Sequence, residues 1–228
     1  MGMFIGTPSS IVTNGLTHCF DAGNTASYPG TGTTWFDVSG NGNNGLILGS
    51  NEGNYSTSNG GYFQTSTSGI MRMPWVRDAS ADLTLSWWYM HLTDNHYGIL
   101  FESRNAANSA DSRPLLEGNN TQFSYGHASN AFGYDVTKDV WRYVTVSQTH
   151  GGDSYIWVNG VQQDTSNSAN SGLATSKLNW GSRAGGSGTG GGSYGQSARW
   201  AMIQVYNRGI TLAEHTQNYN AHKHRFGL

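Results

Sequence analysis

The sequence predicts an all-β fold: a two-sheet antiparallel sandwich with one short helix near the C-terminus. Residues 83–90, 140–147 and 154–163 alternate apolar with polar side chains, which is the period of a half-buried strand. Gly, Ser, Asn and Thr supply 100 of the 228 residues, which favours turns and polar strand faces. The 8 Trp, 12 Tyr and 8 Phe provide buried area that a disordered chain would lack. This length is typical of one sandwich domain.

The sequence predicts a single domain made of successive short strands. Residues 1–13 are interpreted as an N-terminal arm or edge strand, and residues 14–228 as the domain. The alternation at 16–20 predicts the first strand, and 83–90 is the clearest core strand. Trp88 falls on its more polar face, where it is either covered by a loop or exposed. Short strands are also expected at 46–48, 61–64, 98–101 and 123–125.

Two glycine signals mark connections. Asn159-Gly160 between alternating segments predicts a hairpin with a two-residue type I′ turn. Residues 181–195 contain 8 glycines, too many for a regular strand, and we expect a surface loop there.

The C-terminal segment predicts a strand that leads into a capped helix. Strand-forming residues occupy 202–206. Thr211 and Glu214 have the spacing of a capping box, so we expect a helix over 212–221. Lys223 and Arg225 follow at the end where the helix dipole favours cations.

Charge and cysteine content exclude several classes of protein. The net charge is −2 and no basic run precedes the last residues, so nucleic-acid binding lacks its electrostatic basis. No apolar run is long enough for a membrane helix, and no signal peptide is recognisable, so we expect synthesis in a cytoplasm and no membrane partner. The single cysteine, Cys19, is expected to be a small buried residue in a strand.

Two blocks of sequence at opposite ends of the chain carry a family resemblance. Residues 15–45 form the first, with Cys19-Phe20-Asp21 and a Gly/Asn-rich turn after Asp37. The second ends the chain with Tyr206-Asn207-Arg208, the capped helix, Asn218-Tyr219-Asn220 and Arg225-Phe226-Gly227. Together they resemble concanavalin A-like (laminin G-like) jelly-roll domains of the kind found in virion structural proteins of tailed bacteriophages.

The resemblance implies a function in the virion. We expect a non-enzymatic structural protein on the capsid surface, a head decoration or cement protein. Its partners would be the major capsid protein and further copies of itself in a homo-oligomer. The alternative is a lectin-like carbohydrate-binding module of a tail or fibre adsorption apparatus, which would bind a host-surface glycan.

The sequence offers no pair of catalytic groups. Glycosidases, which share the wider superfamily, need two carboxylates across the scissile bond. The four glutamates are Glu52, Glu102, Glu117 and Glu214, and none has a second carboxylate at strand spacing. The eight histidines show no zinc-binding pattern and are expected to be packed or exposed side chains. We therefore expect no enzyme activity, no catalytic residue and no transition metal.

Ligand-binding residues are harder to predict. Exposed aromatic rings could hold a sugar, and Trp75, Tyr97 and Trp180 are the candidates because they fall in or near predicted loops. Asp37, before the Gly/Asn-rich turn, is a candidate calcium ligand. The alternative for Asp37 is an Asx-type turn stabilised by its own side chain, with no cofactor.

The two ends of the chain are expected to dock on the shell or on other subunits. Residues 1–13 and 222–228 are polar or mixed and lie outside the alternating strands. Deletion of either is expected to leave the domain folded.

Overall fold

The computed structural model describes most of the chain. The described residues are 10–47, 54–65, 71–76, 81–93, 98–102, 116–119, 122–125, 131–166, 177–181 and 197–228. Residues 1–9, the region of Tyr97, and residues 182–196, which hold most of the expected glycine-rich loop, lie outside them.

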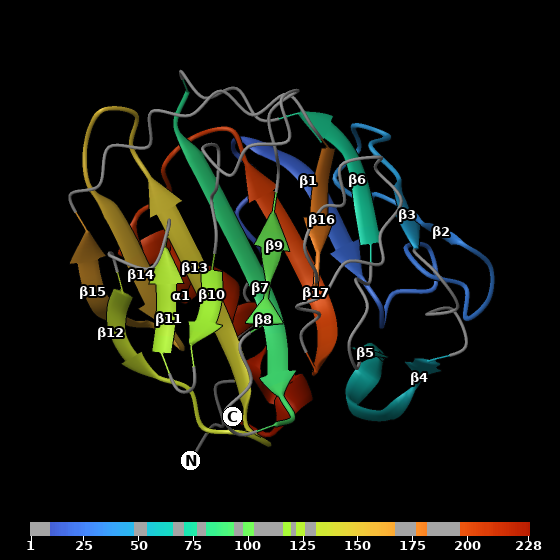
Figure 1. The fold of residues 1–228 in the computed structure, drawn as a ribbon. Helices are drawn as coiled ribbons and strands as arrows, with labels where there is room; N and C mark the ends of the chain where they lie inside the picture. Colours follow the sequence, from blue (N-terminus) through green and yellow to red (C-terminus); the bar gives the residue numbers. More distant parts are fainter. Residues whose placement is uncertain are drawn as a thin grey trace, which may run out of the picture.

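One layer of the molecule is an antiparallel eight-stranded sheet (Figure 1). Its central strands are long and buried on both faces. Across the sheet run β15 (Val161–Ser166), β14 (Ser154–Val158), β13 (Trp141–Gln148), β7 (Leu83–His91), β17 (Ala198–Tyr206), β5 (Tyr62–Thr65) and β4 (Tyr55–Ser56), with β1 (Leu16–Asp21) beside β17 as well.

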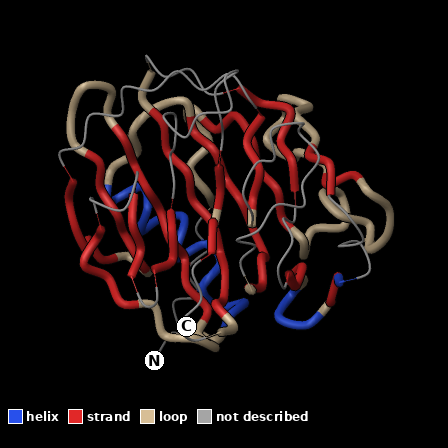
Figure 2. Tube along the Cα trace, viewed as in Figure 1, coloured by secondary structure: helices blue, strands red, loops and turns tan. Residues whose placement is uncertain are grey.

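The opposite layer consists of two smaller sheets. One contains β12 (Ala131–Asp135), β11 (Gln122–Tyr125), β10 (Leu116–Asn119) and β8 (Gly98–Ile99). The other contains β2 (Thr34–Trp35), β3 (Gly45–Ile47), β6 (Met71–Val76), β16 (Lys177–Trp180) and β9 (Phe101–Glu102). Only Leu100 separates β8 from β9, so the two sheets continue one another across the front of the molecule (Figure 2).

The core between the layers is rich in aromatic side chains. Trp35, Trp87, Trp180 and Trp200 all lie there without measurable exposure. Trp87 packs edge-on to Trp180 with ring centroids 6.0 Å apart. The two-sheet antiparallel sandwich predicted from the alternating segments is thereby confirmed.

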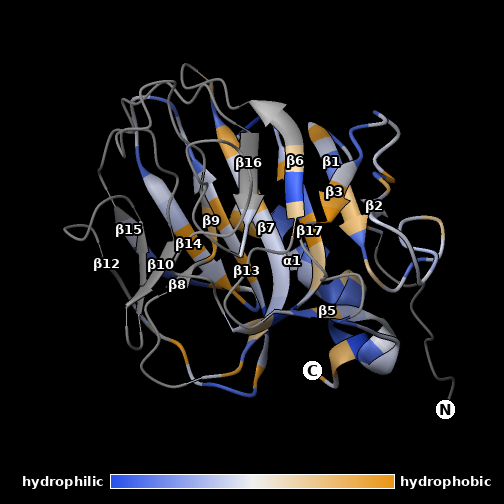
Figure 3. Ribbon diagram, turned by 45° about the vertical axis from the view of Figure 1, so that its right-hand side comes forward, coloured by the Kyte–Doolittle hydropathy of each residue, from blue (hydrophilic) through white to orange (hydrophobic). Residues whose placement is uncertain are grey.

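The helix α1 (Leu212–His222) covers the outer face of the eight-stranded sheet and is followed by a 3₁₀ turn, η3 (Lys223–Phe226). The capping box is confirmed: the Glu214 N–H donates to Thr211 Oγ1 at 3.3 Å and the Thr211 N–H to Glu214 Oε2 at 2.8 Å. Figure 3 draws α1 largely in hydrophilic colours, and two of its three buried residues are polar, His215 and Asn218. Among the described residues, no helix is both long and apolar enough to cross a membrane.

Trp88 is covered by this C-terminal segment. Its indole is fully buried, with the Phe226 ring stacked on it at a centroid distance of 4.2 Å. Phe226 also packs against Trp141 at 4.7 Å. Residues 222–228, which were expected to dock on the shell or on other subunits, thus contribute Phe226 to an aromatic cluster on the sheet.

The hairpin between β14 and β15 has the predicted turn. Asn159 and Gly160 both have positive φ, 51° and 88°, as type I′ requires. Asn159 Oδ1 accepts the Tyr143 N–H at 2.8 Å, and the Gly160 N–H donates to His215 Nε2 at 3.0 Å. The turn thus links the sheet edge to α1.

The outer edge of β1 is covered by the Gly/Asn-rich loop after β2. Asn41 and Asn43 donate their side-chain amides to the carbonyl of Thr17 at 3.2 and 3.1 Å. The backbone of Val38 donates to the Cys19 carbonyl at 2.8 Å. Exposed strand edges are templates for unwanted pairing, so this part of the first sequence block closes an edge.

Candidate functional site

A cleft opens beside α1, at the place where the two sequence blocks meet. Its volume is about 260 Å³. Nine residues line it: Ser10, Ile11, Cys19, Asp21, Asn24, Val38, Met202, Ala221 and His222. We call it the Asp21 cleft. Its floor is apolar, from Cys19, Met202 and Ala221, and its polar groups lie at the rim.

The turn after β1 positions the polar groups of one side. Asp21 Oδ1 accepts the Gly23 N–H at 2.8 Å, and Asn24 Oδ1 accepts the Ala26 N–H at 2.9 Å. These two Asx turns hold both side chains in place. Asp21 Oδ2 and Asn24 Nδ2 form no hydrogen bond with the described residues, so one acceptor and one donor remain free for a ligand.

Arg225, which does not line the cleft, forms an ion pair with the Asp21 carboxylate. Its Nη1 lies 2.7 Å from Asp21 Oδ1, with the two side chains 13% and 16% exposed. The other nitrogens donate to the carbonyls of Asn59 at 3.1 Å and Gly61 at 3.0 Å. A Cβ at Gly23 would overlap the Gly60 carbonyl and approach Arg225, so this close approach requires glycine.

His222 supplies a further acceptor at the end of α1. Its Nδ1 lies 3.4 Å from the Asn218 carbonyl, which can only accept, so Nδ1 carries the proton and Nε2 is an acceptor. Burial lowers the pKa of His222 below its usual range, and the charge of Asp21 opposes that effect in part. The ring is accordingly neutral near pH 7.

The wall formed by Ser10 and Ile11 depends on how the N-terminal segment docks. Asn218 Oδ1 accepts the Val12 N–H at 2.8 Å, and the Tyr206 hydroxyl donates to the Val12 carbonyl at 3.0 Å. Asn218 and Tyr206 are themselves fully buried. Residues 10–13 are thus held along α1 by both backbone groups of Val12, instead of projecting as an arm.

The lining of the cleft holds one carboxylate, one thiol and one imidazole. Asp21 is its single carboxylate, whereas most glycoside hydrolases use a pair of them. Burial raises the pKa of the Cys19 thiol to about 12, so it is a protonated, weak nucleophile. Of the glutamates, Glu52 lies outside the described residues, Glu102 and Glu117 are described only as backbone positions on β9 and β10, and Glu214 belongs to the capping box.

Asp37 forms the Asx-type turn that was the alternative to calcium binding. Its Oδ1 accepts the N–H groups of Cys19 and Ser39 at 2.8 and 2.9 Å. Its Oδ2 accepts the Ser39 hydroxyl at 2.8 Å and the Asn43 N–H at 3.0 Å. These hydrogen bonds to the carboxylate outweigh burial and hold the pKa of Asp37 below its usual value. Four bonds match the four acceptor positions of a carboxylate, so the side chain is satisfied within its own loop.

Metal-ligating side chains elsewhere in the described residues do not form a cluster. No group of three or more His, Cys, Asp or Glu side chains there could hold a metal ion. His18 and His215 are packed residues with 1% and 0% exposure.

The three aromatic candidates do not come together in the cleft. Trp180 lies on β16 in the core with 0% exposure, and its Nε1 donates to Met73 Sδ at 2.8 Å, so its ring has no face for a sugar. Trp75 lies on β6 as a backbone position, and Tyr97 falls outside the described residues. Sequence reasoning placed Trp75 and Trp180 near loops because β6 and β16 were not recognised as strands.

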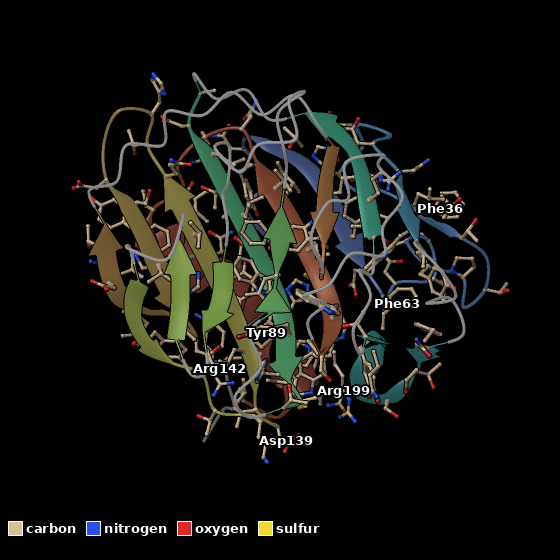
Figure 4. The ribbon with its side chains drawn as sticks, viewed as in Figure 1. Phe36, Phe63, Tyr89, Asp139, Arg142 and Arg199 are labelled. Atoms are coloured by element: carbon tan, nitrogen blue, oxygen red, sulfur yellow. The ribbon has the colours of Figure 1, made fainter. Side chains whose placement is uncertain are left out.

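Phe36 is a second exposed feature that the sequence did not single out. Its ring is 41% exposed, and Figure 4 places it beyond β2, at one end of the sandwich. Leu46 on β3 is 48% exposed. Phe36 serves below as a reference position, because it lies outside the cleft lining.

Comparison with known proteins identifies the fold. No family model matches the chain, and no curated protein matches it. Solved structures do match. A sialidase of Trypanosoma rangeli in complex with sialic acid aligns with a TM-score of 0.66 at 15% identity, over 92% of this chain and 33% of that one. The chain is a β-sandwich.

Two further similar structures belong to binding proteins. The binding domain of Paraclostridial Mosquitocidal Protein 1 aligns with a TM-score of 0.63 at 12% identity, over 92% of this chain and 52% of that one. Botulinum neurotoxin type C, whose cell entry is described as dependent on interaction with two ganglioside molecules, gives the same TM-score, identity and coverages. The chain spans about a third to a half of these structures, and at such identities the likeness concerns the fold alone.

Proposed function

We propose that this chain is a lectin-like, non-catalytic binding domain, and that the Asp21 cleft binds a carbohydrate. The observation that carries the proposal is the convergence of unpaired polar groups over an apolar floor. Asp21 Oδ2 and His222 Nε2 are acceptors and Asn24 Nδ2 is a donor, and all three residues line one cleft of about 260 Å³. Pockets of this composition are typical ligand sites.

A sugar ring fits this arrangement chemically. Each sugar hydroxyl can donate to Asp21 or His222 and accept from Asn24. The C–H face of a pyranose is apolar and suits the floor of Met202, Ala221 and Cys19. The lining includes no Phe, Tyr or Trp, so Met202 and Val38 would take the place of a stacking platform. Such a site would be weak singly, and display in many copies would strengthen it.

The similar structures support a binding role without deciding the ligand. One of them is a binding domain, and another belongs to a neurotoxin whose cell entry is described as dependent on gangliosides. The third is an enzyme, and this chain matches a third of that protein's length.

A glycan array tests the proposal. The protein would be applied as a multivalent conjugate, together with Asn24→Asp, which keeps the Oδ1 acceptor of its turn and removes the Nδ2 donor. We expect binding by the wild type and at least a tenfold loss in Asn24→Asp. Phe36→Ala is the control and should bind normally. Binding lost in Phe36→Ala and kept in Asn24→Asp would place the site elsewhere.

The proposal that the domain has no hydrolytic activity is tested separately. Oligosaccharides that bind would be incubated with the protein and assayed for new reducing ends. We expect no release. Release that disappears in Glu102→Gln or Glu117→Gln would make the chain a hydrolase.

For the biological setting we propose display on a virion, as a head decoration or cement protein bound to the major capsid protein. This part rests on the sequence resemblance of residues 15–45 and 202–228 to virion proteins of tailed bacteriophages. Repeated display in a homo-oligomer would supply the multivalency that a weak glycan site needs. Gold labelling of purified particles should decorate the head. Labelling at the tail tip would favour an adsorption module, and absence from particles would end the virion proposal.

A further inference from the structure

The charges around the Asp21 cleft favour one class of sugar. The nine lining residues include no lysine and no arginine, and Asp21 is their one carboxylate. Asp21 is 16% exposed, so its charge is screened less by solvent than that of a surface carboxylate.

The neighbouring Arg225 guanidinium does not reverse the negative character of the cleft lining. Arg225 already donates hydrogen bonds to Asp21 Oδ1 and to the carbonyls of Asn59 and Gly61. It does not line the cleft. A ligand therefore meets the free Oδ2 of Asp21 before it meets the guanidinium. His222 offers Nε2 as a lone-pair acceptor, which also repels a carboxylate.

We propose that the Asp21 cleft selects neutral sugars and rejects carboxylated ones, such as sialic acids and uronic acids. The inference rests on the proposed carbohydrate-binding function. Recognition of a sugar carboxylate requires a cation or several N–H donors aimed into the site, whereas this lining offers Asn24 Nδ2 as its free side-chain amide donor. Two like charges in a partly buried cleft would weaken binding further.

The ligand class thus differs from what the similar structures would suggest. The sialidase structure is a complex with sialic acid, and cell entry of the neurotoxin is described as dependent on gangliosides. The same sandwich can carry sites of opposite charge preference because function depends on the site and not on the fold.

The test compares glucose with glucuronate and galactose with galacturonate, which differ in one carboxylate, and lactose with 3′-sialyllactose, which carries one added sialic acid. Each sugar is immobilised at equal density. Among the pairs that bind, we expect the neutral member to bind at least tenfold more tightly. Asp21→Asn keeps an acceptor for Gly23 and Arg225 and replaces the free acceptor with an uncharged donor. In Asp21→Asn the affinities for the neutral and the carboxylated member of a pair should differ by no more than threefold.

The outcomes separate the two claims. Equal or tighter binding of the carboxylated members by the wild type overturns the inference and leaves carbohydrate binding in place. A wild-type ratio retained in Asp21→Asn overturns the role given to Asp21. Binding of no member of any pair overturns the proposed function itself and the inference with it.

Discussion

At Thr211 the chain turns from extended backbone into α1, and two side chains satisfy the first N–H groups of the helix. The same Glu214 carboxylate also pairs with Arg208 at 2.6 Å. That interaction lowers the pKa of Glu214 despite partial burial. The start of α1 is therefore joined to the end of β17 by side chains within seven residues of sequence.

Replacement of Thr211 by Ala should destabilise the protein by about 0.5–2 kcal/mol, because the Glu214 N–H loses its acceptor. The measurement is the midpoint of urea unfolding. Thr216→Ala is the matched control, since this half-buried Thr lies inside α1 and Ala is the better helix former. Equal stability of Thr211→Ala and wild type would show that the cap contributes nothing.

Two buried histidines should make the fold sensitive to acid. His215 donates from Nδ1 to Thr145 Oγ1 at 2.8 Å and accepts from Gly160 at Nε2, so protonation would break the second bond. Burial lowers the pKa of His215 to about 3 and, against the opposing charge of Asp37, that of His18 to about 4.

A depressed histidine pKa means that the unfolded chain binds protons first as the pH falls. Stability should be complete above pH ~6.5 and decline toward pH ~4, by on the order of 3 kcal/mol for His18 alone. Urea unfolding across this range measures the slope. His215→Gln should flatten it, whereas exposed His150→Gln should not. A wild-type stability that is constant from pH 7 to pH 4 would contradict the assignment.

At the scale of elements, the C-terminal turn η3 completes the packing of the eight-stranded sheet. Phe226→Ala should cost about 3–5 kcal/mol, because it opens a cavity between Trp88 and Trp141. Thermal unfolding measures this, with Leu228→Ala, 45% exposed, as the control. If removal of the Phe226 ring left the melting temperature unchanged, the turn would not be part of the core.

The edge loop after β2 is a second element with a testable role. The four hydrogen bonds to Asp37 supply its order without a cofactor. Addition of calcium or of EDTA should therefore leave the melting temperature unchanged. Asp37→Ala should lower the free energy of unfolding by about 2–4 kcal/mol. A calcium-dependent rise that is absent in Asp37→Ala would restore the alternative of a calcium site.

The elements that the sequence predicts correctly are those with local signals. The capping box acts over three residues, and the Asn159-Gly160 turn needs only its own backbone. β6 was missed because Pro74 interrupts its pattern. The register with β16 shifts opposite this proline, which is where a strand tolerates one. Because β6 and β16 were not predicted as strands, Trp75 and Trp180 were predicted to lie in or near loops.

The cleft is a property of the whole molecule and could not be predicted from any one segment. Its lining comes from residues 10–11, 19, 21, 24, 38, 202 and 221–222. Both sequence blocks that carry the family resemblance supply part of it, but no periodicity in the sequence predicts that Asp21 and His222 line one cleft. Val12, Asn218 and Tyr206 then fix the wall that the N-terminal segment adds.

The location of the bound sugar tests the central claim most directly. The backbone amides of ¹⁵N-labelled protein would be followed by NMR during titration with the neutral glycan that binds best. We expect the largest shifts at Cys19, Asp21, Asn24, Met202 and His222, and none at Phe36 or Leu46. Shifts confined to Phe36 and Leu46, with the cleft residues unmoved, would contradict the account.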